Sequence, residues 1–210
     1  IYNMSIQLWI YYALAVLVLT ASPGPSSLLC MTKGVTVGWR LAAITALGSL
    51  TAITCIMTLS FTGLGVVIAS SERVFSLVKW AGAAYLIYIG VMCLMSKQES
   101  YTKAKEDSQT ASRSHYLSGF IVGASNPKAI VFFTALFPQF IATDAPLVPQ
   151  YLVFASTFVV MELSWLLFYA YLVARSSNWL LANGRAKVFN RLTGGVFIGA
   201  GALLSLTNRN

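Results

Sequence analysis

The chain has 210 residues, of which 57% are hydrophobic and only 10% are charged. A soluble domain carries about 25% charged residues, so this composition excludes an ordinary soluble protein and indicates a polytopic membrane protein. The formal net charge is +8, but the basic residues gather between apolar stretches, which favours membrane orientation over nucleic-acid binding.

Six apolar stretches are long enough to cross a bilayer, which takes about 20 residues of α-helix. The predicted fold is therefore all-α, with six transmembrane helices in a single transmembrane domain over residues 1–210. The predicted spans are residues 5–32, 41–69, 74–95, 116–141, 148–173 and 188–207. The first span has no basic start, so a cleaved signal peptide is not expected. The second is long for one crossing, so either a tilted helix or an extramembrane turn near Thr62-Gly63 is expected.

A polar segment, residues 96–115, divides the chain into repeat one, residues 1–95, and repeat two, residues 116–210. Its composition is typical of a mobile linker. Each half has three spans, an odd number, so the halves are expected to insert with opposite topology as inverted repeats. A weak internal match supports this: Lys79-x-x-Gly82-x-x-Tyr85-Leu86 corresponds to Arg191-x-x-Gly194-x-x-Phe197-Ile198.

A proline motif interrupts the first span of each half. The two motifs are Ala21-Ser22-Pro23-Gly24-Pro25 and Ala124-Ser125-Asn126-Pro127-Lys128. Proline inside a helix removes a backbone donor and clashes with the carbonyl four residues back, so helices one and four are expected to be broken. In lipid, the freed backbone groups need protein or a water-filled cavity. Matched breaks in two halves predict a transport site between inverted repeats.

The basic residues predict the orientation of the chain. Nine of the 14 Lys and Arg residues lie in loops one, three and five, and Arg191 lies at the edge of loop five. The other side has only Arg73, Lys79 and Arg209. The positive-inside rule places loops one, three and five in the cytoplasm. Both termini are then expected on the outer side.

Each proline motif also resembles a helix start within the membrane. Asn126 is a good N-cap before Pro127, and Gly24 or Ser22 is the cap expected before Pro25. A helix N-terminus presents free N–H groups and about half a positive charge, which attracts anions. At about 1.5 Å per residue, both breaks lie near the middle of a core about 30 Å thick. The predicted substrate-binding residues are Ser22, Pro23, Gly24, Pro25, Ser26, Asn126, Pro127 and Lys128.

Two ionisable residues lie well inside spans, Lys128 and Glu162. In one interpretation they form a structural ion pair. In the other, Lys128 helps to hold a substrate carboxylate, while Glu162 binds an ammonium group or a coupling proton. Ionisable residues in a membrane mark functional sites by default, which favours the second interpretation. Thr51 and Tyr85 are further candidates for lining the pathway.

These motifs resemble the lysine exporter superfamily, specifically its homoserine/threonine-resistance branch. The matching segments are Ser22–Pro25, Lys79–Leu86 with Gly90, and Asn126–Lys128 followed by Phe132–Phe140. The resemblance implies an exporter of amino acids in the bacterial inner membrane, driven by the proton motive force and self-associating, with a dimer as the candidate assembly. Members that export lysine carry an acidic residue in the second span. This chain has Ser49, Leu50 and Thr51 there, which favours a neutral amino acid such as homoserine, threonine or leucine.

Two alternatives stay open at this point. Ser22 or Ser26 with Lys128 is a conceivable pair for acyl chemistry in an intramembrane enzyme. The second alternative is a thiol electron conductor. Such a protein needs a cysteine pair at the two breaks, and Cys30 has no counterpart in span four. No HExxH motif and no Cys/His cluster is present, so neither a metal nor a cofactor is expected.

Overall fold

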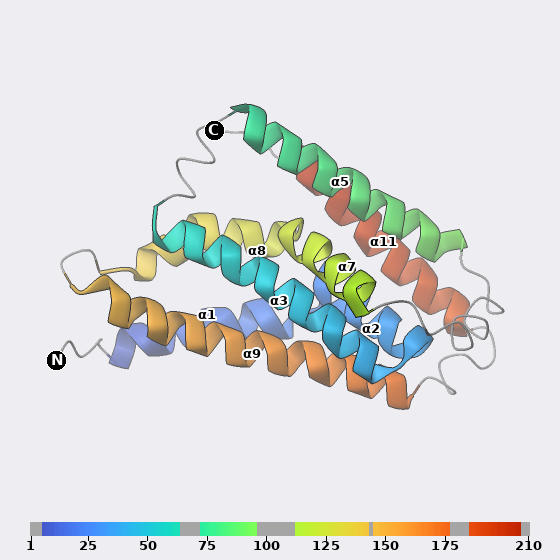
Figure 1. The fold of residues 1–210 in the computed structure, drawn as a ribbon, viewed down its shortest axis with the longest axis horizontal. Helices are drawn as coiled ribbons and strands as arrows, with labels where there is room; N and C mark the ends of the chain where they lie inside the picture. The colour runs from blue at the N-terminus through green and yellow to red at the C-terminus, as the bar shows by residue number, and fades with distance from the viewer. Residues whose placement is uncertain (1–5, 64–71, 96–111, 143–144, 177–184, 207–210) are drawn as a thin grey trace.

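The computed structural model describes residues 6–63, 72–95, 112–142, 145–176 and 185–206. All regular structure within these ranges is helical (Figure 1). The α-helices are α1 (Ile6–Ala21), α2 (Pro25–Val37), α3 (Trp39–Phe61), α5 (Glu72–Met95), α7 (Ser112–Ala124), α8 (Pro127–Val131), α9 (Leu147–Arg175) and α11 (Arg185–Leu206). A π-helical turn, η1 (Phe132–Leu136), and a 3₁₀ turn, η2 (Phe137–Phe140), continue α8.

The helices have the length and composition of membrane helices. Within the described ranges, α3 and α9 are each long and apolar enough to cross a membrane. Helices α1 and α2 form a third candidate as a pair bent by 46° at the break between them. Long apolar helices with large exposed hydrophobic side chains are typical of a membrane protein. The full set of six spans stays a prediction.

The turn between α2 and α3 is shorter than predicted. Residues 33–40, predicted as loop one between two spans, are mostly helical: α2 continues to Val37, α3 begins at Trp39, and Gly38 alone turns the chain with φ +87°. Glycine adopts this conformation without steric cost. Lys33 and Arg40 therefore lie in helices, and their long side chains let the charged ends reach a membrane edge. The turn expected near Thr62-Gly63 is confirmed, since α3 ends at Phe61 and Gly63 has φ +70°.

The predicted linker, residues 96–115, is also shorter at its second end. Residues 112–115 form the first turn of α7. Residues 96–111 lie outside the described ranges. Both ends of the chain also lie outside the described ranges, so the side of the membrane on which they lie stays a prediction.

The helix ends fall into two groups (Figure 1). At one end of the bundle, which we call the α2 end, three helices finish, namely α2, α5 and α9. Three others begin there, namely α3, α7 and α11. Helices α1 and α9 begin at the opposite end, called the α1 end. Helices α5 and α11 run antiparallel, side by side, as a pair next to the other helices.

Glycines let two helix pairs approach closely. Between α3 and α7, a Cβ on Gly119 would lie 1.9 Å from the Thr45 carbonyl oxygen, and one on Gly48 would lie 2.0 Å from that of Tyr116. Between α5 and α11, Gly90 and Gly194 each face the carbonyl of the other, at 2.8 and 2.7 Å from a built Cβ. Small residues at such positions allow backbone contact between membrane helices.

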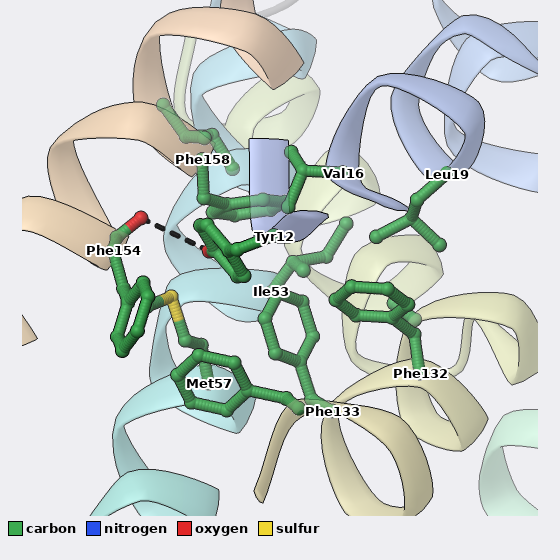
Figure 2. Close-up of a cluster of buried hydrophobic side chains, with 12 residues drawn as sticks. Tyr12, Val16, Leu19, Ile53, Met57, Phe132, Phe133, Phe154 and Phe158 are labelled. Carbon is green, nitrogen blue, oxygen red and sulfur yellow. Dashed lines mark hydrogen bonds between the residues drawn. The ribbon is translucent and has the colours of Figure 1, made fainter. Parts of the chain in front are cut away.

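The larger core is rich in aromatic side chains (Figure 2). It lies towards the α1 end, because α9 begins there and Phe154 and Phe158 are in the first half of that helix (Figure 1). We call it the aromatic cluster, and its buried members are Tyr12, Val16, Leu19, Leu50, Ile53, Met57, Ala129, Phe132, Phe133, Phe137, Phe154 and Phe158. Tyr12 donates a hydrogen bond to the Phe154 carbonyl at 3.0 Å, which satisfies its buried hydroxyl. Phe133 and Phe158 pack edge to face with ring centroids 5.0 Å apart. The cluster thereby joins α1, α3, η1, η2 and α9.

A smaller core attaches the α5–α11 pair to the rest of the bundle. Its buried members are Leu29, Ala83, Leu86, Val122 and Phe197, from α2, α5, α7 and α11. Because it contains few large side chains, it holds these helices together by less buried apolar area than the aromatic cluster does.

Substitution Gly119→Ala should destabilise the protein. The added methyl would meet backbone atoms of α3 that cannot move independently, and overpacking of this kind costs about 1–3 kcal/mol or more. Gly195→Ala on α11 is the matched control, because a Cβ there meets nothing within 4 Å. Thermal unfolding of the purified variants in detergent measures the difference. Equal unfolding temperatures for both variants would contradict the close contact of α3 and α7.

Candidate functional site

The two proline motifs lie against each other. Helix α1 ends at Ala21 and α2 begins at Pro25, with Gly24 as an extended N-cap. Helix α7 ends at Ala124 and α8 begins at Pro127. The Asn126 side chain accepts a hydrogen bond from the Lys128 backbone N–H at 3.1 Å, which is the N-cap expected from the sequence.

A side-chain bond joins the two helix starts. Asn126 Nδ2 donates to Ser26 Oγ at 3.3 Å, although the residues are 100 positions apart in the chain. Ser26 also accepts from Ser49 Oγ of α3, at 2.7 Å. All three side chains are buried. The motifs from the two halves of the chain therefore share one polar network.

A small cavity lies between these helix starts. Five of the predicted site residues line it, namely Gly24, Ser26, Asn126, Lys128 and Glu162. The other lining residues are Leu19, Ser27, Ile53, Ala129 and Phe158. The space open to the centre of a water molecule is about 10 Å³, which is close to the minimum for one buried water. This space is much smaller than an amino acid.

Lys128 binds the end of α1. Its ammonium nitrogen donates to the carbonyls of Leu19 and Ser22, both at 2.5 Å, and to Ser22 Oγ at 3.2 Å. These three acceptors use all three N–H donors of a lysine. The C-terminal end of a helix carries partial negative charge, so a cation is favoured there. Tyr169 of α9 adds a further donor, to the Ala21 carbonyl at 2.5 Å.

Glu162 faces the same cavity from α9. It is only 7% exposed, and among the described residues it forms neither a hydrogen bond nor an ion pair. The structural ion pair with Lys128 is therefore not present in this conformation, although both residues line the cavity. An ionised carboxylate without a partner is costly to bury, so Glu162 requires a proton, a cation or water.

The other predicted site residues lie outside the cavity lining. Ser22 and Pro23 are exposed, and Ser22 belongs to the site only through Lys128. Pro25 and Pro127 are buried in the first turns of α2 and α8. Thr51 is exposed and donates to the Leu47 carbonyl of its own helix, so the structure does not bring it to the cavity.

Ser49 and Tyr169 belong to the network but were not among the predicted site residues. The helical period carries a signal for Ser49. Counting by three and four along the second span places Ser49 on the face of Ala42, Ala46 and Ile53, whereas Thr51 falls on the other face. No signal in the sequence identifies Tyr169, because its partner lies 148 residues away.

A larger cleft lies at the α2 end between α2, α5 and α7. Its volume is about 540 Å³. The lining residues are Leu29, Thr32, Lys33, Thr36, Tyr85, Tyr88, Ile89, Met92, Ser114, Leu117, Ser118 and Ile121. Tyr85 thus lines this cleft and donates to Ser118 Oγ at 3.4 Å. Leu29 of the cleft lining lies one helical turn beyond Ser26 of the small cavity.

His115 lies beside this cleft on the first turn of α7, outside the predicted span of residues 116–141. It is 3% exposed, and neither ring nitrogen has a hydrogen-bond partner in the described part of the chain. Burial, and to a lesser extent the charge of Lys33, lowers the pKa of His115 below 6.5. No group of three or more His, Cys, Asp or Glu side chains among the described residues could hold a metal ion.

Comparison with known proteins gives consistent matches over nearly the whole chain. The model of the LysE type translocator family matches residues 17–208. A homoserine/homoserine lactone efflux protein of Salmonella typhi is 35% identical over 205 residues, covering 96% of this chain and 98% of that protein. An uncharacterized membrane protein of Vibrio cholerae is 31% identical, covering 96% and 98%. A leucine efflux protein of Salmonella choleraesuis is 27% identical, covering 94% and 93%. No solved structure matches.

Acidification should destabilise the protein through His115. Because the folded protein lowers the pKa of His115 below 6.5, the unfolded chain takes up a proton first as the pH falls, so stability is lost as the pH drops through about 6.5. The unfolding temperature in detergent is measured between about pH 7.5 and about pH 5.5. It should fall less for His115→Gln than for the unaltered protein as the pH is lowered. An identical pH dependence for the two proteins would show that His115 does not titrate on unfolding.

Proposed function

The chain belongs to the LysE type translocator family, and we propose that it is a secondary-active exporter of neutral amino acids driven by the proton motive force. Relatives are named as efflux proteins for homoserine, homoserine lactone and leucine. These compounds have uncharged side chains. Homoserine, threonine and leucine are therefore the first substrates to test.

One observation carries this proposal: the small cavity holds Lys128 and Glu162 without a direct bond between them. A zwitterionic amino acid has a carboxylate and an ammonium group. The start of α2 and the charge of Lys128 favour the carboxylate, and Glu162 favours the ammonium group or a proton. The cavity thus offers complementary charge for both groups of the substrate.

The two sides of the cavity support an alternating-access cycle. Leu19, Ile53, Ala129 and Phe158 belong both to its lining and to the aromatic cluster, so the cluster closes it towards the α1 end. Towards the α2 end, the large cleft reaches Leu29, which lies one helical turn beyond Ser26 of the cavity. We assign the large cleft as the cytoplasmic entrance, and rocking of one repeat against the other would open each side in turn.

The proposed arrangement in the membrane follows the sequence. A single domain over residues 1–210 would form six spans in two inverted repeats, residues 1–95 and 116–210. Spans one and four would be broken, as α1 with α2 and as α7 with α8, η1 and η2. The basic loops one, three and five would lie in the cytoplasm, with both termini on the outer side of the bacterial inner membrane. A dimer is the proposed assembly.

The geometry of Lys128 argues against acyl chemistry. A Ser/Lys enzyme needs a lysine nitrogen that accepts the serine proton. Here all three N–H groups of Lys128 donate, including one to Ser22 Oγ. The Salmonella relatives are named as efflux proteins, which agrees with a protein that is not an enzyme.

Substitution Lys128→Ala should reduce transport to background. It removes the positive charge from the cavity and leaves the Leu19 and Ser22 carbonyls without this donor. Proton-driven uptake of labelled homoserine or leucine into inside-out vesicles measures transport, and immunoblotting measures the amount of protein. Lys187→Ala, at an exposed position of α11, is the control and should transport normally. Unchanged transport by Lys128→Ala would remove Lys128 from the site.

Substitution Glu162→Gln should separate transport from proton coupling. Glutamine cannot take up and release a proton, so accumulation against a gradient should be lost. Exchange of substrate across the membrane at equal pH should continue, because exchange needs no net proton movement. Both are measured in proteoliposomes with labelled substrate. Normal accumulation under a pH gradient would exclude Glu162 as the coupling group.

A further inference from the structure

We infer that the Ser26 hydroxyl is held as a hydrogen-bond donor towards the small cavity and binds the carboxylate of the transported amino acid. Ser49 and Asn126 act as positioning residues that fix this polarity. The inference rests on the proposed function, because it assumes that the cavity receives an amino acid.

The direction of the network is set by the cap of α8. A backbone N–H only donates, so the Asn126 atom that faces the Lys128 N–H must be the amide oxygen. The amide nitrogen is then the atom that faces Ser26, at 3.3 Å. A nitrogen of this kind only donates, so Ser26 Oγ must accept from Asn126.

Ser49 occupies the second acceptor position of Ser26. Its hydroxyl donates to Ser26 Oγ at 2.7 Å, and Ser49 is fully buried between α3 and α7. Gly123 of α7 leaves the room that Ser49 needs, since a Cβ on Gly123 would lie 2.9 Å from Ser49 Oγ. Ser49 therefore has little freedom to turn away from Ser26.

Only the O–H of Ser26 remains. A serine hydroxyl has two acceptor lone pairs and one donor, and both acceptor positions are taken. Within the described residues, no acceptor receives this proton. Ser26 is 2% exposed and lines the cavity. The first-turn backbone N–H groups of Ser26 and Ser27 in α2 have no acceptor within their own helix, and both residues line the cavity.

The other charged groups favour a carboxylate at Ser26. Lys128 contributes positive charge, but its three N–H donors are already bound to α1. Glu162 is an acceptor on another wall of the cavity and suits the ammonium group. The carboxylate would therefore take its hydrogen bonds from Ser26 and the start of α2, with Lys128 acting through its charge alone.

Comparing homoserine with its lactone tests the inference, because the lactone keeps the ammonium group but has no carboxylate. Dissociation constants of both are measured by calorimetry on the purified protein in detergent. Ser49→Ala removes one of the two hydrogen bonds that orient the Ser26 hydroxyl, so this hydroxyl can rotate and is no longer held towards the cavity. We expect a roughly tenfold or greater loss of homoserine affinity, the usual effect of a hydrogen bond to a charged group, and a loss of less than about threefold for the lactone.

Ser26→Ala is the second variant. It should lose at least as much affinity for homoserine as Ser49→Ala does, again with little change for the lactone. Because Ser49 acts through Ser26, the double variant should bind homoserine no more weakly than Ser26→Ala alone. Ser156→Ala is the control: this exposed serine of α9 donates to the Val153 carbonyl of its own helix, and both affinities should stay unchanged. Thermal unfolding without ligand shows whether each variant is folded.

The outcomes separate this inference from the proposed function. Equal losses for homoserine and its lactone, or additive losses in the double variant, would overturn the carboxylate assignment while leaving the exporter proposal intact. Binding of neither ligand, nor of leucine or threonine, by the unaltered protein would overturn both.

Discussion

The bond between the Lys128 ammonium group and the end of α1 is the interaction on which the rest of the site depends. A helix that ends inside a membrane leaves carbonyl groups without donors, and lipid supplies none. Lys128 and Tyr169, both from the second half of the chain, supply these donors to the first half. The backbone N–H of Lys128 is at the same time held by Asn126, which reaches Ser26 at the start of α2. One residue thus connects three helix ends around the cavity.

The packing around this centre is uneven. Glycine contacts hold α3 tightly to α7 and α5 tightly to α11, since backbone meets backbone. The contact of the α5–α11 pair with the rest of the bundle uses a smaller cluster of side chains. Helix pairs that are rigid within themselves and joined by modest apolar contacts can move as units, which is what a cycle of opening and closing needs. Of the two cores, the aromatic cluster buries more large side chains, so the proposed cycle would open more easily at the smaller one.

Much of the site could be predicted from the sequence, because its chemistry is local. A proline motif in an apolar span predicts a helix start wherever the helix lies, and the Asn126 cap followed from neighbouring residues alone. Gly24, Ser26, Asn126, Lys128 and Glu162 were predicted and do line one cavity. The features that were not predicted depend on how a helix is rotated about its axis and on contacts between distant parts of the chain. Thr51 was chosen for its polarity, but its helix turns it outward and places Ser49 inward. The acceptors of Lys128 come from a segment more than 100 residues away, and no spacing rule reports them.

The size of the small cavity also bears on the leakage of protons through the protein. A polar path filled by a continuous file of water would conduct protons and dissipate the ion gradients of the membrane. The small cavity has room for about one water molecule, and four of its lining residues belong to the aromatic cluster. On that side, packed apolar side chains fill the space that a file of water would need, so a path for protons is interrupted there.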